Sequence, residues 1–267
     1  MQPMLTIALK AARKAGEIIA RATDQLDTLV VEEKNANDFV SEVDRSAERE
    51  VIYHLKKAYP DHAFLGEESG ETGDSNSEYR WIIDPLDGTT NFVRGIPHFC
   101  VSIACEYRGQ IEHGVVLDPI RREEFTASRG RGAQLNGRRI RVSPRKNLDG
   151  ALIATGILHK SRCDEHIPAY MEALREVAEK TAGIRRAGSA ALDLAYVAAG
   201  RLDAYWEMKL KPWDIAAGAL LVREAGGLVS DFNGGNDYMQ SGNVVCGNAK
   251  CLKAVLQIVQ PHLGAIC

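Results

Sequence analysis

The sequence predicts a mixed α+β and α/β protein, with an antiparallel sheet in its N-terminal half and a mixed sheet with helices in its C-terminal half. Between residues 98 and 143, short runs of strand-forming residues are joined by tight turns, which is typical of antiparallel pairing. From about residue 149 onward, similar runs alternate with longer helical patterns, which is typical of a sheet covered by helices. We therefore expect an N-terminal α+β subdomain over residues 1–148 and a C-terminal α/β subdomain over residues 149–267.

The composition is that of an ordinary globular protein. With 267 residues, of which 45% are hydrophobic and 26% charged, the chain can bury a core in one large domain or two modest ones. No apolar run reaches the roughly 18 residues of a membrane-spanning helix, and charged residues interrupt the apolar ones near the N-terminus. We therefore expect a cytoplasmic protein without a signal peptide. The six cysteines lack zinc-type spacing and are interpreted as core thiols in a reducing compartment: Cys100, Cys105, Cys163, Cys246, Cys251 and Cys267.

Two helices are expected before the first sheet. Apolar residues recur at helical spacing over residues 4–22, and a second helical pattern runs from Asp44 to Ala58. Asp44 has two open interpretations, as a cap of the second helix or as a catalytic carboxylate. The remaining elements of this half are a strand at 63–65, an acidic turn at 66–70, a polar loop at 71–78, strands at 81–83, 99–107, 111–117 and 124–127, and a hairpin at 133–140 around Asn136-Gly137.

In the C-terminal half, segments with the apolar spacing of a helix alternate with short apolar runs that are typical of strands. A helix over residues 213–225 is closed by Gly226-Gly227, a common helix stop. The other expected helices are 166–181, 190–199 and one that begins at about 249, and the expected strands are 152–155, 184–186, 202–206, 228–230 and 243–246.

The stretch Trp81–Phe92 has the clearest chemical pattern in the chain. An apolar run that is typical of a buried strand ends in two carboxylates, Asp84 and Asp87. Pro85 keeps Asp84 extended, and Gly88 followed by two threonines adds a flexible backbone and hydroxyl groups. A surface turn is the alternative, because these residue types are common in turns. The whole run after a buried strand favours a site for a hard cation such as Mg²⁺, which takes oxygen ligands.

Two further acidic residues stand at the ends of expected elements. Glu67 lies in the acidic turn after the strand at 63–65, and Asp214 lies at the start of a helix. A helix start favours a carboxylate in any case, but a carboxylate between apolar neighbours usually needs a partner, and a cation is one. The segment Gly188-Ser189-Ala190 opens another helix, where amide groups can hold an anion.

Three motifs, in this order, resemble the inositol monophosphatase family: Gly66-Glu67-Glu68-Ser69, the run Trp81–Phe92, and Trp213-Asp214-x-x-Ala217-Gly218 with Glu224-Ala225-Gly226-Gly227. The similarity covers almost the whole chain and includes the segments 133–137 and 188–196. It implies a layered α-β-α-β-α sandwich of the sugar-phosphatase type. It also implies a homodimer.

The resemblance implies a role for each matching residue. Asp84 would bridge two metal ions, and Thr89 with Asp44 would orient the attacking water. Lys34 would match a lysine that the family often has before the segment Asp38-Phe39-Val40. The implied catalytic residues are Asp44, Thr89 and Glu67; the metal ligands are Glu67, Asp84, Leu86 through its carbonyl, Asp87 and Asp214; and the substrate contacts are Glu67, Leu86, Asp87, Gly88, Thr89, Arg185, Gly188, Ser189, Ala190, Glu207 and Asp214.

The implied activity is Mg²⁺-dependent hydrolysis of inositol-1-phosphate and similar small phosphate monoesters, inhibited by Li⁺. Two or three Mg²⁺ ions would neutralise the anionic phosphate, activate a water and stabilise the leaving alkoxide. A metal-activated water makes a covalent nucleophile unnecessary, and no Cys or His is placed to be one. Within enzymes, the alternative is a phosphatase for sugar phosphates or nucleotide 3′-phosphates, since the metal turn occurs across the wider superfamily.

A second class of function is regulatory. A bacterial branch of the family is associated with transcription, as a partner of RNA polymerase and the Nus antitermination factors on ribosomal RNA. The feature of this chain that would fit RNA binding is the basic segment 121–146, which has nine Arg or Lys residues against two Glu. Aromatic residues are not interleaved with these cations as base stacking would need, so a solvated surface is the favoured interpretation.

Overall fold

A computed structural model describes residues 2–28, 31–35, 38–156 and 166–265. The larger of its two main sheets has eight strands in the order β10-β9-β8-β7-β6-β5-β3-β4. Every neighbouring pair is antiparallel except β3 and β5, which are parallel. The strands are β3 (Ala63–Gly66), β4 (Gly70–Gly73), β5 (Tyr79–Asp87), β6 (Cys100–Tyr107), β7 (Gln110–Asp118), β8 (Glu123–Ser128), β9 (Gly132–Leu135) and β10 (Arg138–Arg139).

The second sheet is mixed and lies in the C-terminal half, as the sequence predicts. Its order is β12-β11-β13-β15-β14, with β11 parallel to both of its neighbours and β15 antiparallel to both of its own. The strands are β11 (Leu152–Thr155), β12 (Gly183–Arg185), β13 (Ala204–Glu207), β14 (Leu228–Ser230) and β15 (Val244–Gly247). A separate small hairpin joins β1 (Val31–Asn35) to β2 (Asp38–Ser41).

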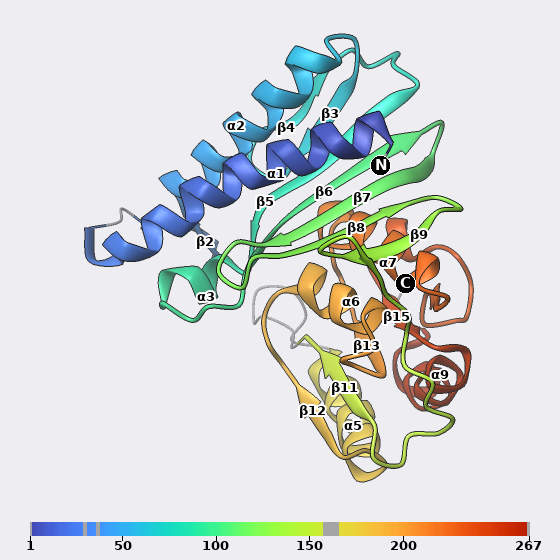
Figure 1. Ribbon diagram of the computed structural model, residues 1–267. Coiled ribbons are helices and arrows are strands. Elements are labelled where there is room, and N and C mark those ends of the chain that lie inside the picture. Colours follow the sequence, from blue (N-terminus) through green and yellow to red (C-terminus); the bar gives the residue numbers. More distant parts are fainter. Residues whose placement is uncertain (1, 29–30, 36–37, 157–165, 266–267) are drawn as a thin grey trace.

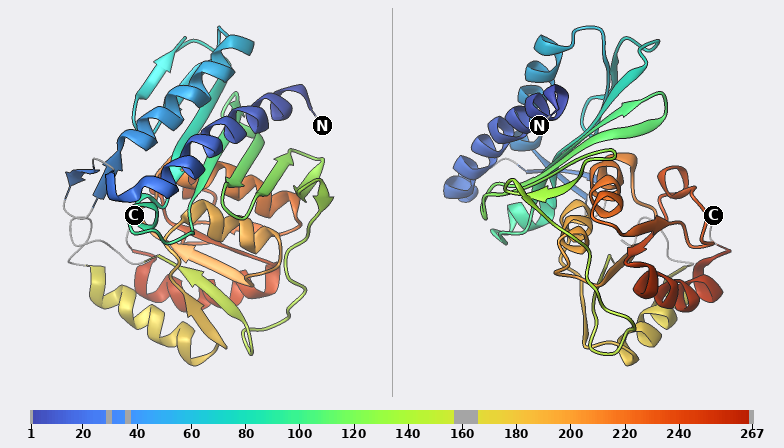
Figure 2. Two further views of the ribbon diagram at one scale, coloured as in Figure 1. Left: turned by 60° about the vertical axis from the view of Figure 1, so that its left-hand side comes forward. Right: turned by 45° about the vertical axis from the view of Figure 1, so that its right-hand side comes forward.

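Helices and sheets alternate in five layers (Figures 1 and 2), which confirms the predicted α-β-α-β-α sandwich. One helix pair covers the outer face of the large sheet, a second pair lies between the sheets, and a third covers the far face of the small sheet. The three pairs are α1 (Pro3–Ala22) with α2 (Glu42–Ala58), α6 (Ala190–Ala198) with α7 (Pro212–Glu224), and α5 (Ile167–Glu179) with α9 (Ala249–Leu263). The short elements η1 (Thr23–Thr28), α3 (Thr89–Val93) and α8 (Tyr238–Ser241) lie in the connections.

Each gap between layers has its own hydrophobic core. Side chains on a strand alternate between its two faces, so β6 contributes side chains to the cores on both faces of the large sheet. Cys100 packs in the core shared with α6 and α7, whereas Cys105 packs in the core under α1 and α2. Cys246 and Cys251 are also buried free thiols, as predicted, while Cys163 and Cys267 lie outside the described residues.

The tight turn at Asn136-Gly137 has the geometry that its sequence indicates. Both residues have positive φ angles, 49° and 76°, and they join β9 to β10. The backbone twist of such a two-residue turn matches the right-handed twist of the two strands that it joins. Asn and Gly adopt positive φ more readily than other residues.

Two predictions about the N-terminal half need correction. Residues 71–78 are not a loop throughout, because β4 occupies Gly70–Gly73 at the edge of the large sheet. Its glycines and polar residues have little strand preference, so pairing with β3 decides its conformation. The second helix begins at Glu42, not Asp44, so Asp44 lies inside the first turn and is not its cap.

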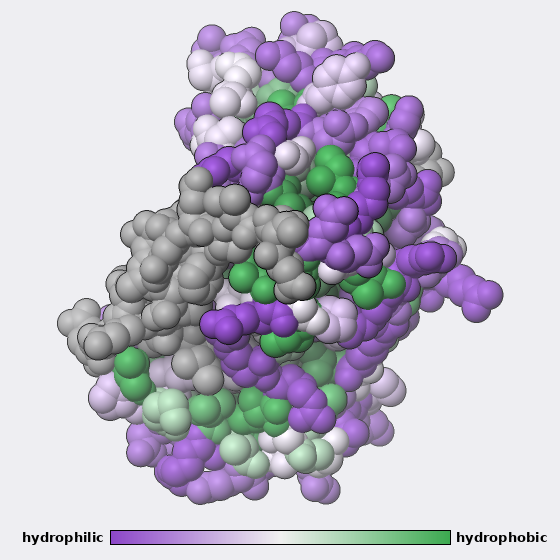
Figure 3. All heavy atoms as spheres, turned by 90° about the vertical axis from the view of Figure 1, so that its left-hand side faces the viewer, coloured by the Kyte–Doolittle hydropathy of each residue, from purple (hydrophilic) through white to green (hydrophobic). Residues whose placement is uncertain are grey.

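On the face in Figure 3, hydrophilic side chains predominate, and the hydrophobic ones form small groups. Among the helices of the described residues, none combines the length and the apolar character that crossing a bilayer would require.

Candidate metal centre and active site

A bulge at the end of β5 turns two carboxylates to the same face of the large sheet. In the pairing of β5 with β6, Asp84 is opposite Ser102 and Asp87 is opposite Cys100, so three steps on β5 match two on β6. Pro85 lies in the bulge and has no amide hydrogen to donate to β6. In a regular strand, Asp84 and Asp87 would face opposite sides, and the extra residue brings them into phase.

The third carboxylate comes from α7, which packs on that same face. Ser102 donates a hydrogen bond of 3.1 Å to the carbonyl oxygen of Trp213, which fixes the start of α7 beside β6. Asp214 lies in the first turn, and its Oδ2 accepts a hydrogen bond of 2.7 Å from the amide of Lys211. As a result, Asp84, Asp87 and Asp214 each offer an oxygen within 4.8 Å of the others.

The carboxylates of this cluster repel one another. Burial raises the pKa of Asp84 well above its ordinary value, and the charges of Glu67, Asp87 and Asp214 raise it further. Burial and the charge of Asp87 likewise raise the pKa of Asp214 well above the ordinary value. Burial raises the pKa of Asp87, although hydrogen bonds from its neighbours partly oppose this. Buried carboxylates that repel one another are typical of a site where a divalent cation compensates the charge.

Glu67 approaches the cluster from the turn between β3 and β4. Its amide donates a hydrogen bond of 3.1 Å to the carbonyl oxygen of Ile83, and its side chain is close enough to share a hydrogen bond with Asp84. The turn is held by Glu48 of α2, a buried carboxylate that accepts hydrogen bonds from the amides of Glu68 (3.0 Å) and Ser69 (2.9 Å). Glu48 was not predicted from the sequence, although it lies one helical turn after Asp44 on the same face of α2.

Asp44 and Thr89 meet beside the bulge. The hydroxyl oxygen of Thr89 lies 3.0 Å from Asp44 Oδ1 and also 3.0 Å from the carbonyl oxygen of Leu86. A hydroxyl has one hydrogen, so the two acceptors compete for it, and the lone pairs of the Thr89 oxygen remain able to accept a hydrogen bond. Asp44 is 1% exposed, so its interaction with Thr89 is shielded from bulk water.

The turn after Asp87 packs closely against the loop that precedes α6. Gly88 has a φ of 97°, and a Cβ atom there would lie 2.9 Å from the carbonyl oxygen of His98 and 3.2 Å from that of Gly188. The side-chain amide of Asn91 joins the two segments, since it donates hydrogen bonds of 2.8 Å to the carbonyl oxygens of both His98 and Ala187. This role of Asn91 was not predicted from the sequence, because one of its acceptors, Ala187, lies 96 residues further along the chain.

Ser189 contacts the carboxylate cluster directly. Its hydroxyl donates a hydrogen bond of 2.6 Å to Asp87 Oδ2, and the amide of Ala191 donates one of 2.7 Å to the same oxygen. The thiol of Cys100 lies 3.8 Å from that oxygen and contributes a weaker contact. These three donors all use Oδ2, and none of them occupies the other oxygen of Asp87. The family resemblance implies a substrate contact for Ser189, whereas its hydroxyl faces Asp87 in the structure.

We expect Ser189→Ala to weaken the apparent affinity for the metal. Loss of a group that orients a ligand typically reduces metal affinity or activity by about 10- to 100-fold. The measurement is phosphate release as a function of Mg²⁺ concentration, with Ser128→Ala, another buried serine bonded to a side chain, as the control. A raised substrate KM with an unchanged Mg²⁺ dependence would contradict this positioning role and favour a substrate contact.

The other implied substrate contacts are more spread out. Glu207 ends β13, accepts a hydrogen bond of 2.5 Å from the hydroxyl of Tyr205, and fills the space where Gly156 lacks a side chain. The exposed guanidinium of Arg185 donates to the carbonyl oxygen of Ile184, 3.2 Å away. Arg186, which was not predicted, instead reaches the loop at Gly188, within 3.0 Å of where a Cβ atom would stand.

Asp193 and Lys34 differ in how they relate to the predicted site. Asp193 was not predicted: it is buried one turn after Ser189 on α6, and burial together with the charge of Glu207 raises its pKa well above the ordinary value. The spacing of four from Ser189 could have indicated that it shares this face of the helix. Lys34 lies on β1, but its side chain lies outside the part of the structure that is described.

Comparisons with known proteins agree with this architecture. The model of the inositol monophosphatase family matches residues 1–263. The Nus factor SuhB of Pseudomonas aeruginosa is 60% identical over 265 residues, which are 98% of this chain and 98% of that protein. The crystal structure of the extragenic suppressor protein suhB from Bartonella henselae has a TM-score of 0.94 at 46% identity and covers 97% of this chain and 99% of that one. The inositol monophosphatase from Anabaena has a TM-score of 0.84 at 35% identity, with coverage of 98% and 97%.

Proposed function

The chain belongs to the inositol monophosphatase family, and from this premise we propose that it hydrolyses inositol-1-phosphate and similar small phosphate monoesters with the help of Mg²⁺. The observation that carries the proposal is the cluster of Asp84, Asp87 and Asp214, whose oxygens lie within 4.8 Å of one another. Family and fold support a phosphatase, and the cluster supplies the ligands that such a reaction needs.

The donor set fits a hard divalent cation. Asp84, Asp87 and Asp214 offer carboxylate oxygens, and the positions proposed to join them, Glu67 and the Leu86 carbonyl, also offer oxygen. Bound here, two or three Mg²⁺ ions would neutralise the phosphate, lower the pKa of a bound water and stabilise the leaving oxygen. The raised pKa of Asp84 and Asp214 agrees with a site that is built to be compensated by positive charge.

Thr89 and Asp44 are proposed to position the attacking water and take up its proton. The Thr89 hydroxyl has two acceptors, Asp44 Oδ1 and the Leu86 carbonyl, at equal distances of 3.0 Å. If the Leu86 carbonyl serves as a metal ligand, Asp44 remains as the acceptor for that hydroxyl. The Thr89 oxygen can then accept a hydrogen bond from a water, while Asp44 lies behind it as the base.

The phosphate and the alcohol are proposed to bind on two sides of this water. The amides at Gly88 and Thr89 begin a short helix, where amide hydrogens lack acceptors within the helix, so they suit phosphate oxygens. The loop Gly188–Ala190 and Glu207 are proposed to contact the hydroxyl groups of a phosphorylated polyol. Arg185 remains a proposed substrate contact. Arg186 reaches the loop at Gly188, and we add it to the proposed substrate contacts.

A panel of monoesters tests the proposed substrate. We expect phosphate release from inositol-1-phosphate to exceed release from a hexose phosphate and a nucleoside 3′-phosphate, and to be inhibited by Li⁺. Preference for the sugar phosphate or the nucleotide would identify the alternative specificity. A purified protein that released phosphate from no member of the panel would contradict the proposal.

A second role, in transcription, is favoured by one finding: the relative at 60% identity is named Nus factor SuhB. We propose that this chain also associates with RNA polymerase and Nus factors, and that it is a homodimer in the cytoplasm. The basic segment 121–146 offers mixed support. Arg121, Arg129 and Arg145 are paired with carboxylates, whereas within the described residues no ion pair involves Arg122, Arg131, Arg138, Arg139, Arg141 or Lys146.

Complementation of a strain that lacks the chain's gene separates the two roles. If the cellular role is binding, Asp87→Asn should restore growth although its phosphatase activity is lost, because the substitution removes one half-buried charge and changes little of the surface. Growth that instead falls in parallel with activity across a series of metal-ligand variants would remove the support for a binding role.

A further inference from the structure

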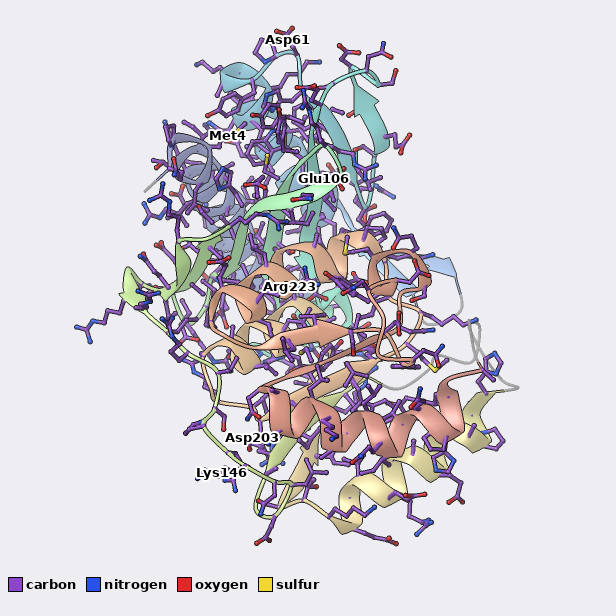
Figure 4. The ribbon with its side chains drawn as sticks, turned by 90° about the vertical axis from the view of Figure 1, so that its right-hand side faces the viewer. Met4, Asp61, Glu106, Lys146, Asp203 and Arg223 are labelled. Carbon is purple, nitrogen blue, oxygen red and sulfur yellow. The ribbon has the colours of Figure 1, made fainter. Side chains whose placement is uncertain are left out.

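A large groove lies along α7 and contains none of the proposed metal ligands. It has a volume of about 1020 Å³ and runs between the turn that joins β6 to β7, the loop before α7, the length of α7, and α8. In Figure 4, the labelled Glu106 lies on the sheet side of this region and Arg223 on the helix layer below it. Pockets of this size are large enough for a ligand or a segment of another chain.

The groove carries an excess of positive charge. Five cationic side chains and two carboxylates line it. The carboxylates are already engaged: Glu106 pairs with Arg80 at 3.1 Å, and Glu224 accepts hydrogen bonds from the amides of Gly130 and Gly132. Arg129 pairs with Glu112, which leaves three cations for which the described part of the chain supplies no carboxylate partner: Lys209, Lys211 and Arg223.

The loop that carries the two lysines is held in a defined conformation. Lys209 has a φ of 60°, a left-handed conformation that is unfavourable for a residue with a side chain. The amide of Lys209 donates to Asn243 Oδ1 at 3.2 Å, and the amide of Leu210 donates to the carbonyl oxygen of Gly242 at 3.0 Å. Strain that the surrounding structure maintains is often associated with a functional surface, since it fixes side chains that a relaxed loop would let move.

The spacing of the cations indicates an elongated ligand. Lys211 and Arg223 stand near opposite ends of α7, which at about 1.5 Å per residue places their backbones about 18 Å apart. A single phosphate could not contact both. Half-buried apolar side chains lie between and beside the cations, and they make the surface amphipathic: Ile111, Leu210, Pro212 and Met239.

A single-stranded nucleic acid and an acidic peptide would both suit this length, and the aromatic residues of the groove distinguish between these two ligands. Tyr238 is the aromatic residue among the lining residues, but it is 7% exposed and the Arg223 guanidinium lies 5.3 Å from its ring centre. Single-stranded nucleic acid usually stacks its bases on exposed aromatic rings, and this groove offers none among its described lining. An apolar floor with a cationic rim matches an amphipathic acidic peptide.

We propose that this groove binds an acidic, amphipathic segment of a partner protein. Its charged side would meet Lys209, Lys211 and Arg223, and its apolar side would cover the exposed parts of Met239 and Ile111. The inference goes beyond the phosphatase activity and does not rest on it.

The test uses a labelled helical peptide of about 18 residues, long enough to span the groove at about 1.5 Å per residue, with Glu on one face and Leu on the other. Fluorescence anisotropy should show binding that weakens with added salt. Replacing Lys209, Lys211 and Arg223 together by Gln should weaken it about tenfold, a loss of about 1.4 kcal/mol. The matched control replaces Arg131, Arg138 and Arg139, three cations outside the groove, by Gln and should change affinity less than about twofold.

Three results would overturn the proposal. The first is no binding of the peptide to the wild-type protein. The second is equal weakening by the groove and control variants, which would indicate non-specific attraction. The third is a groove-dependent affinity for an oligouridylate of equal charge that exceeds the affinity for the peptide, which would make the groove a nucleic-acid site. Matching thermal unfolding curves of the variants and the wild type exclude a loss of fold as the cause.

Discussion

Replacing Asp84 by Asn is expected to lower the rate of Mg²⁺-dependent phosphate release by at least about a thousandfold. Metal ions at such a site supply several kcal/mol of stabilisation to the transition state, and about 4 kcal/mol corresponds to that factor. Asp84 stands at the centre of the cluster, since the charges of Glu67, Asp87 and Asp214 all act on it. Asn has nearly the same shape and can still accept the hydrogen bond from the Leu86 amide, so the bulge should persist.

Asp118→Asn is the matched control for this substitution. Asp118 is 1% exposed, against 2% for Asp84, and it pairs with Arg121 at 2.9 Å. Because Asp118 is not a proposed metal ligand, its substitution tests the loss of a buried carboxylate outside the proposed metal site. We expect this control to reduce stability and to retain most of the activity per folded molecule. If Asp84→Asn and Asp118→Asn lowered activity to a similar extent, the effect would come from general destabilisation and the proposed role of Asp84 would be wrong.

Without divalent cations, the protein is expected to become less stable as the pH rises above the ordinary aspartate pKa of 3.8. Burial and neighbouring charges raise the pKa of Asp84 and Asp214 in the folded state, so over this range the folded protein holds more protons than the unfolded chain. The free energy of unfolding therefore falls with increasing pH, and the loss is complete above the raised pKa values. Urea unfolding in the presence of a chelator, at a series of pH values, measures it.

Mg²⁺ is expected to reverse that loss. Binding to the folded state alone stabilises it by about 2.7 kcal/mol at a hundred times the dissociation constant. The Asp84→Asn variant should show a flatter pH dependence in chelator and a smaller gain with Mg²⁺, because one of the repelling charges is gone. The same pH dependence in the variant and the wild type would mean that other groups cause it, and the carboxylate cluster would not be the source of the instability.

Local sequence patterns predicted the parts of the fold that depend on local chemistry. The turn at Asn136-Gly137 and the helix stop at Gly226 follow from backbone preferences of Gly and Asn, and the structure has both. The five-layer fold came from the family resemblance and is confirmed. The edge strand β4 could not be predicted, since its residues pair with β3 against their own weak preference. The division into subdomains at residues 148 and 149 remains a prediction.

The candidate site also contains some residues that local sequence patterns predicted and others that they did not. Asp84 and Asp87 stand out because they share one short run, and the structure brings Asp214 to them across more than a hundred residues of chain. The hydrogen bonds that hold these ligands were not predicted from the sequence. Ser189 was expected to contact the substrate and not Asp87, and Glu48, which holds the turn that carries Glu67, was not singled out. Both residues act between segments that are distant in the chain, so no local pattern gives their partners.

The central claim is that the carboxylates at the end of β5 and the start of α7 form the metal centre of a phosphatase. The most direct measurement is phosphate release from inositol-1-phosphate by the purified protein, first in excess chelator and then with added Mg²⁺. The account predicts negligible release in chelator, recovery as Mg²⁺ is added, and no recovery in the Asp87→Asn variant. Release that proceeds equally well in chelator, or that Asp87→Asn leaves intact, would contradict it.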